Sequence, residues 1–203
     1  FEATGKRAYL DQALTWQRAF DLHYANPDIA GYFATADDAE GLIVRPNATS
    51  DDAIPNPNAI AAQNLIRLAV LNGDDRWREA ADRLIEGVLA VAAPNFVGHA
   101  ALLNAIDLRL GGLEIVVIGF GQAADTLAET AVKLPFINRS VLRASSSDQL
   151  TAHHPARAKI EATLQPAAFV CSGATCSLPM TDPRQLAILA GNMPPPSASN
   201  SAL

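Results

Sequence analysis

The spacing of apolar residues changes near residue 112, and this change constrains the fold more than any other feature of the sequence. Before it, apolar residues recur every three or four positions, as they do along one face of an amphipathic helix. This spacing predicts helices over residues 5–24, 58–72, 74–93 and 97–111. Because short links ending in glycine or proline join the last three, we expect antiparallel helical hairpins.

Beyond Gly112 the pattern is that of an α/β structure. A run of apolar residues predicts a buried strand over 114–118, followed by a helix that ends at Pro135 and a strand over 140–143. A third strand is expected over 168–171 and a last helix from Asp182 or Pro183 to about residue 190. We therefore expect parallel strands, the first two joined by a right-handed crossover.

The expected organisation is mainly α with a small α/β part. Residues 1–112 are expected to form helical hairpins with a long loop and a β-hairpin, residues 113–192 a small parallel α/β layer, and residues 193–203 a disordered tail. The chain opens on Phe1 rather than Met, with a helix-forming run almost at once. We therefore expect it to be a piece of a longer protein.

Composition excludes several classes of function. Hydrophobic residues make up 49% and charged residues 18%, which fits a well-packed globular chain rather than a disordered one. A net charge of -6 without a basic stripe argues against a nucleic-acid partner. There is no apolar run long enough to span a membrane, and two cysteines are too few for a disulfide scaffold. We therefore expect a cytoplasmic protein.

The long connection between residues 28 and 57 is the best place in the sequence for a site, since long ordered loops often carry function. Segments 31–35 and 41–45 flank a polar turn and predict a β-hairpin. Carboxylates gather around Arg45 in this connection: Asp37, Asp38, Glu40, Asp51 and Asp52. Two of them facing a cleft could act as acid and base toward a sugar, and the alternative is a solvated loop.

Two other motifs have a chemical and a structural interpretation each. The glycines of Gly119-Phe120-Gly121 stand between a strand and a helix, where a dinucleotide site would need them, although an ordinary turn explains them too. Cys171 and Cys176 could form a redox pair, supply two metal ligands, or be structural. A zinc site needs two further ligands, so we expect no metal and no cofactor.

Aromatic and histidine side chains on helices favour core packing. Trp16 and Trp77 fit the expected apolar stripes, although aromatic platforms also stack on sugars. The first helix is expected to bury a stripe of Tyr9, Ala13, Trp16 and Phe20. His23 and His99 lie on otherwise apolar faces and are expected to pack there rather than act as bases.

Several segments in order resemble one known family. They are Gly31-Tyr32-Phe33, Arg45, residues 51–62, the strand 114–119, Phe169-Val170-Cys171 and Cys176-Ser177-Leu178-Pro179. Together they resemble the C-terminal third of the thioredoxin-domain-containing family that includes the spermatogenesis-associated, thioredoxin-like proteins. The resemblance covers about residues 5 to 190.

The resemblance implies a fold and a site. Family members look like a thioredoxin-like domain followed by an (α/α)6 barrel similar to N-acylglucosamine 2-epimerase and six-hairpin glycosidases. This chain would then hold closing hairpins of the toroid and lack the thioredoxin domain. The family's Pro-Ser-Gly-Asn-Ser segment corresponds to residues 55–59, where Pro57 and Ala59 replace the glycine and the second serine. These replacements remove backbone freedom and a hydroxyl.

On this basis we expect Asp51 and Arg45 as catalytic residues and Asn58 and Tyr32 as substrate-binding residues. Arg45, Asp51 and Asn58 should converge on one concave surface, where Asn58 caps the helix that follows and the arginine lowers the pKa of Asp51. The expected function is carbohydrate processing or carbohydrate binding, with a sugar as ligand. The alternatives are a non-catalytic interaction module that self-associates or packs on a missing N-terminal region, and a redox-linked protein that uses Cys171 and Cys176.

Overall fold

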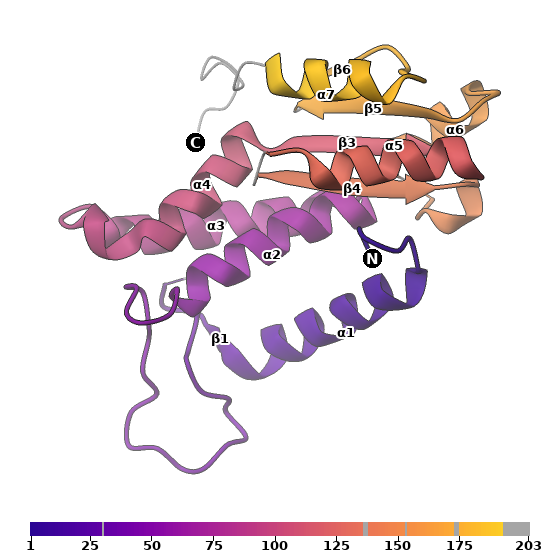
Figure 1. The fold of residues 1–203 in the computed structure, drawn as a ribbon. Helices are drawn as coiled ribbons and strands as arrows, with labels where there is room; N and C mark the ends of the chain where they lie inside the picture. Colours follow the sequence, from indigo (N-terminus) through magenta and orange to yellow (C-terminus); the bar gives the residue numbers. More distant parts are fainter. Residues whose placement is uncertain (30, 136–137, 153, 173–174, 193–203) are drawn as a thin grey trace. The chain divides into compact units, whose positions relative to one another are not determined.

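The computed structural model of the chain describes residues 1–29, 31–135, 138–152, 154–172 and 175–192 (Figure 1). Two compact units follow from the contacts within it. The helical unit comprises residues 8–69 and 74–109, and the sheet unit comprises residues 1–7 and 70–73 together with the described residues from 110 onward. The expected domain limits at residue 112 stay a prediction. The expected tail, 193–203, lies outside the described residues.

The helical unit is built from α1 (Arg7–Tyr24), α2 (Pro57–Asn72), α3 (Asp75–Ala92), the short 3-10 helix η1 (Phe96–His99) and α4 (Ala100–Gly111). The apolar stripes of α2, α3 and α4 meet in one core, in which Leu65, Leu84 and Leu102 are almost completely buried. The expected mainly helical character of this region is therefore confirmed. Asp74 begins α3 by accepting a hydrogen bond from the backbone N–H of Arg76.

The buried face of α1 differs from the expected stripe. Leu10, Leu14 and Gln17 are buried, whereas 55% of Tyr9 and 68% of Trp16 are exposed. The expectation that Trp16 packs in the core was wrong, because the helix buries a face turned by about one residue. Trp77 on α3 packs against the core as expected.

The β-hairpin of the long connection also lies elsewhere than expected. Strand β1 (Ala25–Asn26) pairs antiparallel with β2 (Gly31–Tyr32), while residues 41–45 form no strand. The expected pairing of 31–35 with 41–45 was wrong for a visible reason. The side chain of Asn58 bonds both the N–H and the C=O of Tyr32, so it takes the backbone positions that a further strand would need.

The sheet unit holds a four-stranded sheet in the order β4-β3-β5-β6. Its elements are β3 (Leu113–Ile118), α5 (Gln122–Lys133), β4 (Arg139–Ala144), the 3-10 turn η2 (Ser147–Gln149), α6 (Ala156–Ala162), β5 (Ala167–Ser172), β6 (Thr175–Cys176) and α7 (Pro183–Asn192). As expected, β3, α5 and β4 form a parallel βαβ unit. The expectation that the third strand is parallel was wrong, since β5 runs antiparallel to β3.

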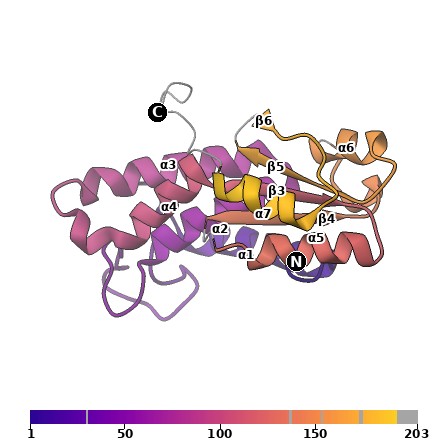
Figure 2. The same cartoon turned by 45° about the horizontal axis from the view of Figure 1, so that its top comes forward.

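Strands β3 and β5 are buried on both faces, which explains the unbroken apolar run of β3. Ile115, Val117 and Val170 form one core with α5 and α7, which pack against each other and the strands (Figure 2). Val116 and Phe169, which alternate with these residues along the strands and so lie on the opposite face of the sheet, are buried as well.

The N-terminal segment lies along the outer edge of β4. The backbone N–H of Val141 donates a 2.8 Å hydrogen bond to Oε1 of Glu2. Gly5, which has φ 68°, lies against the side chain of Arg143. Arg7 then donates a bond to the carbonyl of Gln149 as α1 begins. The sheet unit thus includes its own edge cover.

Within the described residues, no helix combines the length and the apolar character that crossing a bilayer requires.

Candidate functional site

A pocket of about 390 Å³ opens in the helical unit between the C-terminal turns of α1 and the long connection that precedes α2. Three aromatic side chains, Phe20, Tyr24 and Phe33, line it together with the loop residues Ala34, Ala48, Ser50, Asp52, Ile54, Pro55, Asn56 and Pro57. Its volume lies within the range of about 300–1,000 Å³ typical of small-molecule sites. The pocket is therefore the candidate site of this chain.

The aromatic wall is held in place by stacking. Phe20 and Tyr24 are four residues apart on α1, with ring centroids separated by 4.9 Å, and Phe20 also packs at 4.2 Å against Tyr32 behind it. The hydroxyl of Tyr32 donates a 2.6 Å bond to Asp21 and accepts one from Gln17. Burial, followed by the bond to Asp21, raises the pKa of Tyr32, so this phenol stays protonated.

Asn56 forms the buried floor of the pocket and starts α2. Its Oδ1 accepts a 2.8 Å bond from the N–H of Ala59, and its Nδ2 donates a 2.8 Å bond to Asp51. Asn56 therefore occupies the N-cap position that the sequence assigned to Asn58, and that assignment was wrong by two residues. Pro57 fits the first helical turn because its missing N–H is not needed there.

Asp51 serves as a structural carboxylate rather than as part of the pocket lining. Its oxygens accept bonds from the N–H of Ala101 near the start of α4, and from the N–H and the Nδ2 of Asn56. Desolvation alone would raise the pKa of Asp51, but these hydrogen bonds outweigh it and hold the pKa below its usual value. The lowered pKa of Asp51 agrees with the expectation, but the groups that donate to its carboxylate are amides and not the guanidinium of Arg45.

Arg45 points elsewhere. Its Nη2 donates bonds of 2.8 Å to the carbonyl of His23 and 2.6 Å to that of Thr35, and its Nε donates a further bond to Thr35. The guanidinium also lies 4.2 Å from the centroid of the Phe33 ring. Arg45 therefore ties the loop to the end of α1 and supports one aromatic wall from behind.

Asn58 is completely buried and fully bonded. Its Oδ1 accepts a 2.7 Å bond from Tyr32 N–H, while its Nδ2 donates to the carbonyls of Tyr32 and Ala48 and contacts Asn47 Oδ1 at 3.5 Å. None of Tyr32, Arg45, Asp51 and Asn58 lines the pocket, so the expected convergence on one concave surface is not what this geometry gives. Instead, they hold its walls. Their assignment as catalytic or substrate-binding residues stays a prediction.

The lining residues that sequence reasoning did not assign to a site include all three aromatic ones. Phe20 was assigned to a core stripe, Phe33 was noted only in the expected hairpin and in the family resemblance, and Tyr24 was not singled out. Aromatics at the end of a helix and just after a tight hairpin are nevertheless a usable signal. Asp52 was considered only among the loop carboxylates. It is exposed, and within the described residues its carboxylate has no hydrogen-bond or ion-pair partner.

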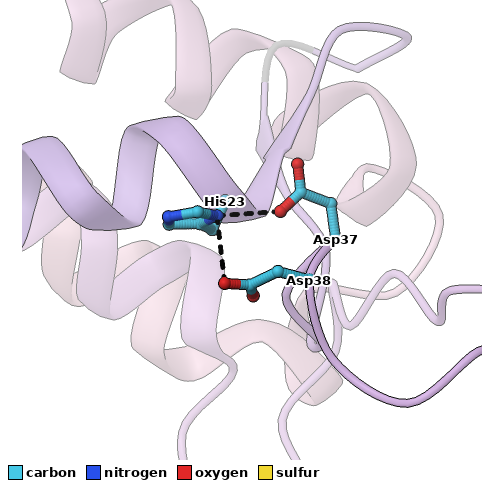
Figure 3. Close-up of side chains that lie close together, drawn as sticks. All are labelled: His23, Asp37 and Asp38. Atoms are coloured by element: carbon cyan, nitrogen blue, oxygen red, sulfur yellow. Dashed lines mark hydrogen bonds and ion pairs between the residues drawn. The ribbon is translucent and has the colours of Figure 1, made fainter.

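A second group of side chains lies at the C-terminus of α1 (Figure 3). His23 Nδ1 is 2.9 Å from Asp37 Oδ1 and 3.6 Å from Asp38 Oδ2. The hydrogen bond to Asp37 is the main reason why the pKa of His23 is raised, and the same bond lowers the pKa of Asp37. His23 thus faces carboxylates, whereas His99 is buried and bonds the carbonyl of Asn95, as a packing histidine does.

The glycine turn before α5 has a structural explanation. Gly119 has φ 105°, and a Cβ there would lie 2.9 Å from Cα of Pro166. Asp125, in the first turn of α5, is paired with Arg143. The turn therefore allows the chain to pass close to Pro166, which precedes β5, and this supports the ordinary-turn interpretation drawn from the sequence.

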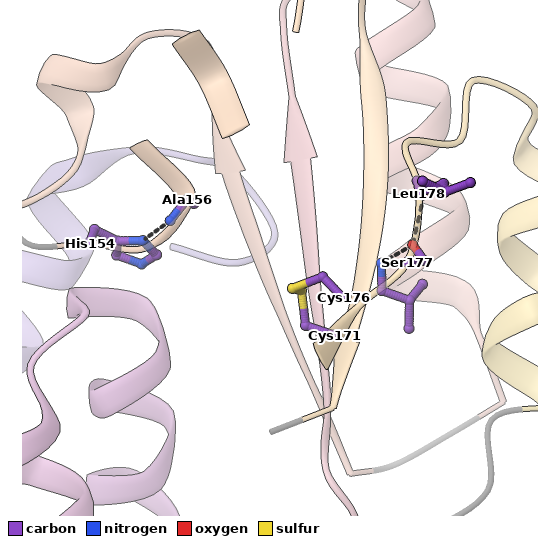
Figure 4. Close-up of a disulfide and its surroundings, with 7 residues drawn as sticks. His154, Ala156, Cys171, Cys176, Ser177 and Leu178 are labelled. Atoms are coloured by element: carbon purple, nitrogen blue, oxygen red, sulfur yellow. Dashed lines mark hydrogen bonds between the residues drawn. A yellow bond between two sulfur atoms is a disulfide. The ribbon is translucent and has the colours of Figure 1, made fainter. Parts of the chain in front are cut away.

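Cys171 and Cys176 are joined by a disulfide between β5 and β6 (Figure 4). The two residues face each other in the antiparallel register, with Cα atoms 4.0 Å apart. In this oxidised state neither sulfur is a thiolate, so the pair supplies no metal ligand. A redox role for the pair stays a prediction.

The chain is similar to known proteins over most of its length. It is 30% identical to human spermatogenesis-associated protein 20 over 193 residues, which cover 92% of this chain and 25% of that protein. It is 28% identical to the mouse protein of the same name over 198 residues, covering 92% and 24%, and 29% identical to an uncharacterized protein of Caenorhabditis elegans over 186 residues, covering 89% and 25%. No family model matches the chain.

These similarities support the family resemblance found in the sequence. The chain spans about a quarter of the length of the curated relatives it matches. A thioredoxin domain and an (α/α)6 barrel stay predictions, as does any sugar chemistry.

Proposed function

We propose that this chain is part of a spermatogenesis-associated protein 20-like protein and that its aromatic pocket binds a small carbohydrate. The observation that carries the proposal is the pocket lining, which combines the rings of Phe20, Tyr24 and Phe33 with the exposed carboxylate of Asp52. Similarity over 92% of the chain supports the family assignment. A cytoplasmic location and a toroid completed by further helices belong to the same proposal.

The chemistry of the lining suits a sugar. A pyranose presents apolar C–H faces, which pack on aromatic rings, and equatorial hydroxyls, which need acceptors at the rim. Asp52 and Ser50 supply such polar groups beside the aromatic wall. A charged acceptor strengthens a hydrogen bond to a hydroxyl, so Asp52 is the residue that would fix the orientation of the ligand.

The lining favours binding over hydrolysis. Glycoside hydrolysis requires two carboxyl groups on opposite sides of the scissile bond. Among the described lining residues Asp52 is the one acid. Asp51 lies outside the lining, and its carboxylate is engaged by Ala101 and Asn56. The proposal is therefore a carbohydrate-binding pocket.

Calorimetric titration with a panel of mono- and disaccharides tests this proposal. Asp52→Asn and Phe33→Ala should each weaken binding at least about tenfold, since each removes an interaction worth about 1.5 kcal/mol or more. Trp16→Ala is the matched control, because this exposed aromatic lies on the same helix as Phe20 but outside the lining. Binding that is as strong in Asp52→Asn and Phe33→Ala as in the parent chain, or no binding by any sugar of the panel, contradicts the proposal.

The alternative of a non-catalytic interaction module is favoured by a different observation. The last turn of α3 and the short helix η1 expose apolar side chains, with Val91 at 51%, Phe96 at 44% and Val97 at 92% exposure. Exposed apolar groups that gather on one surface are a common mark of protein contacts. This alternative concerns a different part of the helical unit and does not exclude a pocket ligand.

A further inference from the structure

The end of α1 carries a mixed set of donor groups that the proposed pocket does not use. His23 stands in the last turn of α1, whereas Asp37 and Asp38 lie in the turn that follows the β2 segment (Figure 3). None of these residues lines the pocket. The fold therefore brings one imidazole nitrogen and two carboxylates together from two separate segments.

The spacing of the donor atoms suits coordination of one ion. One ligand atom from each residue lies within 4.8 Å of the other two. Ligand atoms that are each about 2.1 Å from a tetrahedral or octahedral ion are about 3.0–3.5 Å from one another. The observed separations of 2.9 Å and 3.6 Å between His23 Nδ1 and the two carboxylates bracket this range.

The backbone holds the two segments together without help from these side chains. The carbonyl of His23 accepts a 2.9 Å bond from the N–H of Asp37 and a 2.8 Å bond from Nη2 of Arg45. Such positioning reduces the conformational entropy that binding would cost.

The charge and the solvent exposure of these three side chains suit the binding of a cation that enters from solvent. Side-chain exposure is 34% for His23, 53% for Asp37 and 66% for Asp38. Two carboxylates side by side repel each other, and a divalent cation would relieve that repulsion. A nitrogen donor beside two oxygens favours a transition metal over Mg²⁺ or Ca²⁺, which prefer all-oxygen ligands.

We propose that His23, Asp37 and Asp38 bind one divalent transition-metal ion, with zinc as the best-suited ion, through Nδ1 of the imidazole and one oxygen of each carboxylate. Solvent would complete the coordination, because the three protein donors leave positions open. The proposal is independent of the carbohydrate pocket.

Titration of the full chain with ZnCl₂, followed by calorimetry and by NMR of the histidine rings, tests the proposal. We expect one saturable site, a shift of the His23 ring signals on zinc addition, and no equivalent binding of MgCl₂. His23→Gln, Asp37→Asn and Asp38→Asn should each weaken zinc binding at least tenfold. Glu161→Gln, which removes an exposed carboxylate in the sheet unit, should leave it unchanged.

Other results overturn the proposal. These are absence of saturable zinc binding, zinc binding that leaves the His23 ring signals unmoved, or zinc binding as tight in His23→Gln as in the parent chain. Circular dichroism and thermal melts of each variant separate a lost site from a lost fold. Since Asp37 and Asp38 are exposed and His23 is only partly buried, we expect the variants to remain folded.

Discussion

Asn58 shows how much of the site architecture depends on one buried amide. Its side chain forms hydrogen bonds with the backbone N–H and C=O of Tyr32, where a neighbouring strand would otherwise pair, and it also donates to the carbonyl of Ala48. Asn58 therefore joins β2, the following loop and α2. We expect Asn58→Ala to lower the free energy of unfolding by about 2–4 kcal/mol, because several buried backbone groups lose their partners. Urea denaturation measures this. Gln12→Ala, on the exposed side of α1, is the control, and an equally small effect of both changes would contradict the assignment.

His154 gives a pH dependence whose sign follows from its burial. Its Nε2 donates to the carbonyl of Val70 and its Nδ1 accepts from the N–H of Ala156, so both nitrogens serve the neutral ring. Desolvation, with a smaller effect of Arg7, lowers its pKa below the ordinary 6.5, although the bond to Val70 acts in the opposite direction. The unfolded chain therefore binds this proton more readily, and stability should fall as the pH drops below about 6.5.

Chemical denaturation between pH 7.5 and 5 measures that dependence. In His154→Gln the decline of unfolding free energy between these pH values should be smaller than in the parent chain. His23→Gln has the opposite expected effect, since the raised pKa of His23 contributes stability at low pH that is lost as pH rises. Parallel pH profiles for the parent chain and His154→Gln would refute the account of His154.

Single residues in the long loop were only partly predictable from the sequence. A lowered pKa for Asp51 follows from any set of good donors, so its direction was predictable, whereas the identity of the donors depends on where α4 begins. Asn56 and Asn58 are equally good capping residues by type, and only the packing against β2 decides which of them starts the helix. Likewise, the exposed side of α1 depends on tertiary contacts.

At the scale of elements, local periodicity predicted more than strand pairing did. The helices of the first half and the parallel βαβ unit were expected from apolar spacing and turn residues, and both are present. The direction of β5 and the partner of β2 are set by residues far away in the chain, which periodicity does not record. The seven-residue helix α6 is too short to give a clear period, so it was missed.

The turn between β3 and α5 allows a matched comparison of two glycines. Gly119 and Gly121 both have positive φ, but only at Gly119 would an added Cβ meet a neighbour, Pro166, at 2.9 Å. We expect Gly119→Ala to lower the unfolding free energy by about 3 kcal/mol or more and Gly121→Ala by about 1–2 kcal/mol, from backbone strain alone. Guanidinium denaturation compares them. Equal losses would show that the contact with Pro166 does not matter.

At the scale of the whole molecule, exposed apolar side chains predict association. Val97 is 92% exposed in the turn between α3 and α4, close in sequence to the exposed Phe96 and Val91. Sedimentation velocity should show an average mass that rises with concentration, and Val97→Lys should reduce this rise. Leu164→Lys is the control, because Leu164 is fully exposed in the sheet unit. A parent chain that stays monomeric at high concentration would contradict the prediction.

The hydrogen bond between Glu2 and β4 affects the tendency of this chain to aggregate at high concentration. An open strand edge is a template on which other chains add by backbone pairing, the first step toward amyloid growth. One edge of the sheet is β6, which spans only two residues, and the six-residue β4 at the other edge has its Val141 N–H occupied by the Glu2 carboxylate. Glu2 thus covers part of this edge, and its removal would leave the Val141 N–H open to backbone pairing with another chain.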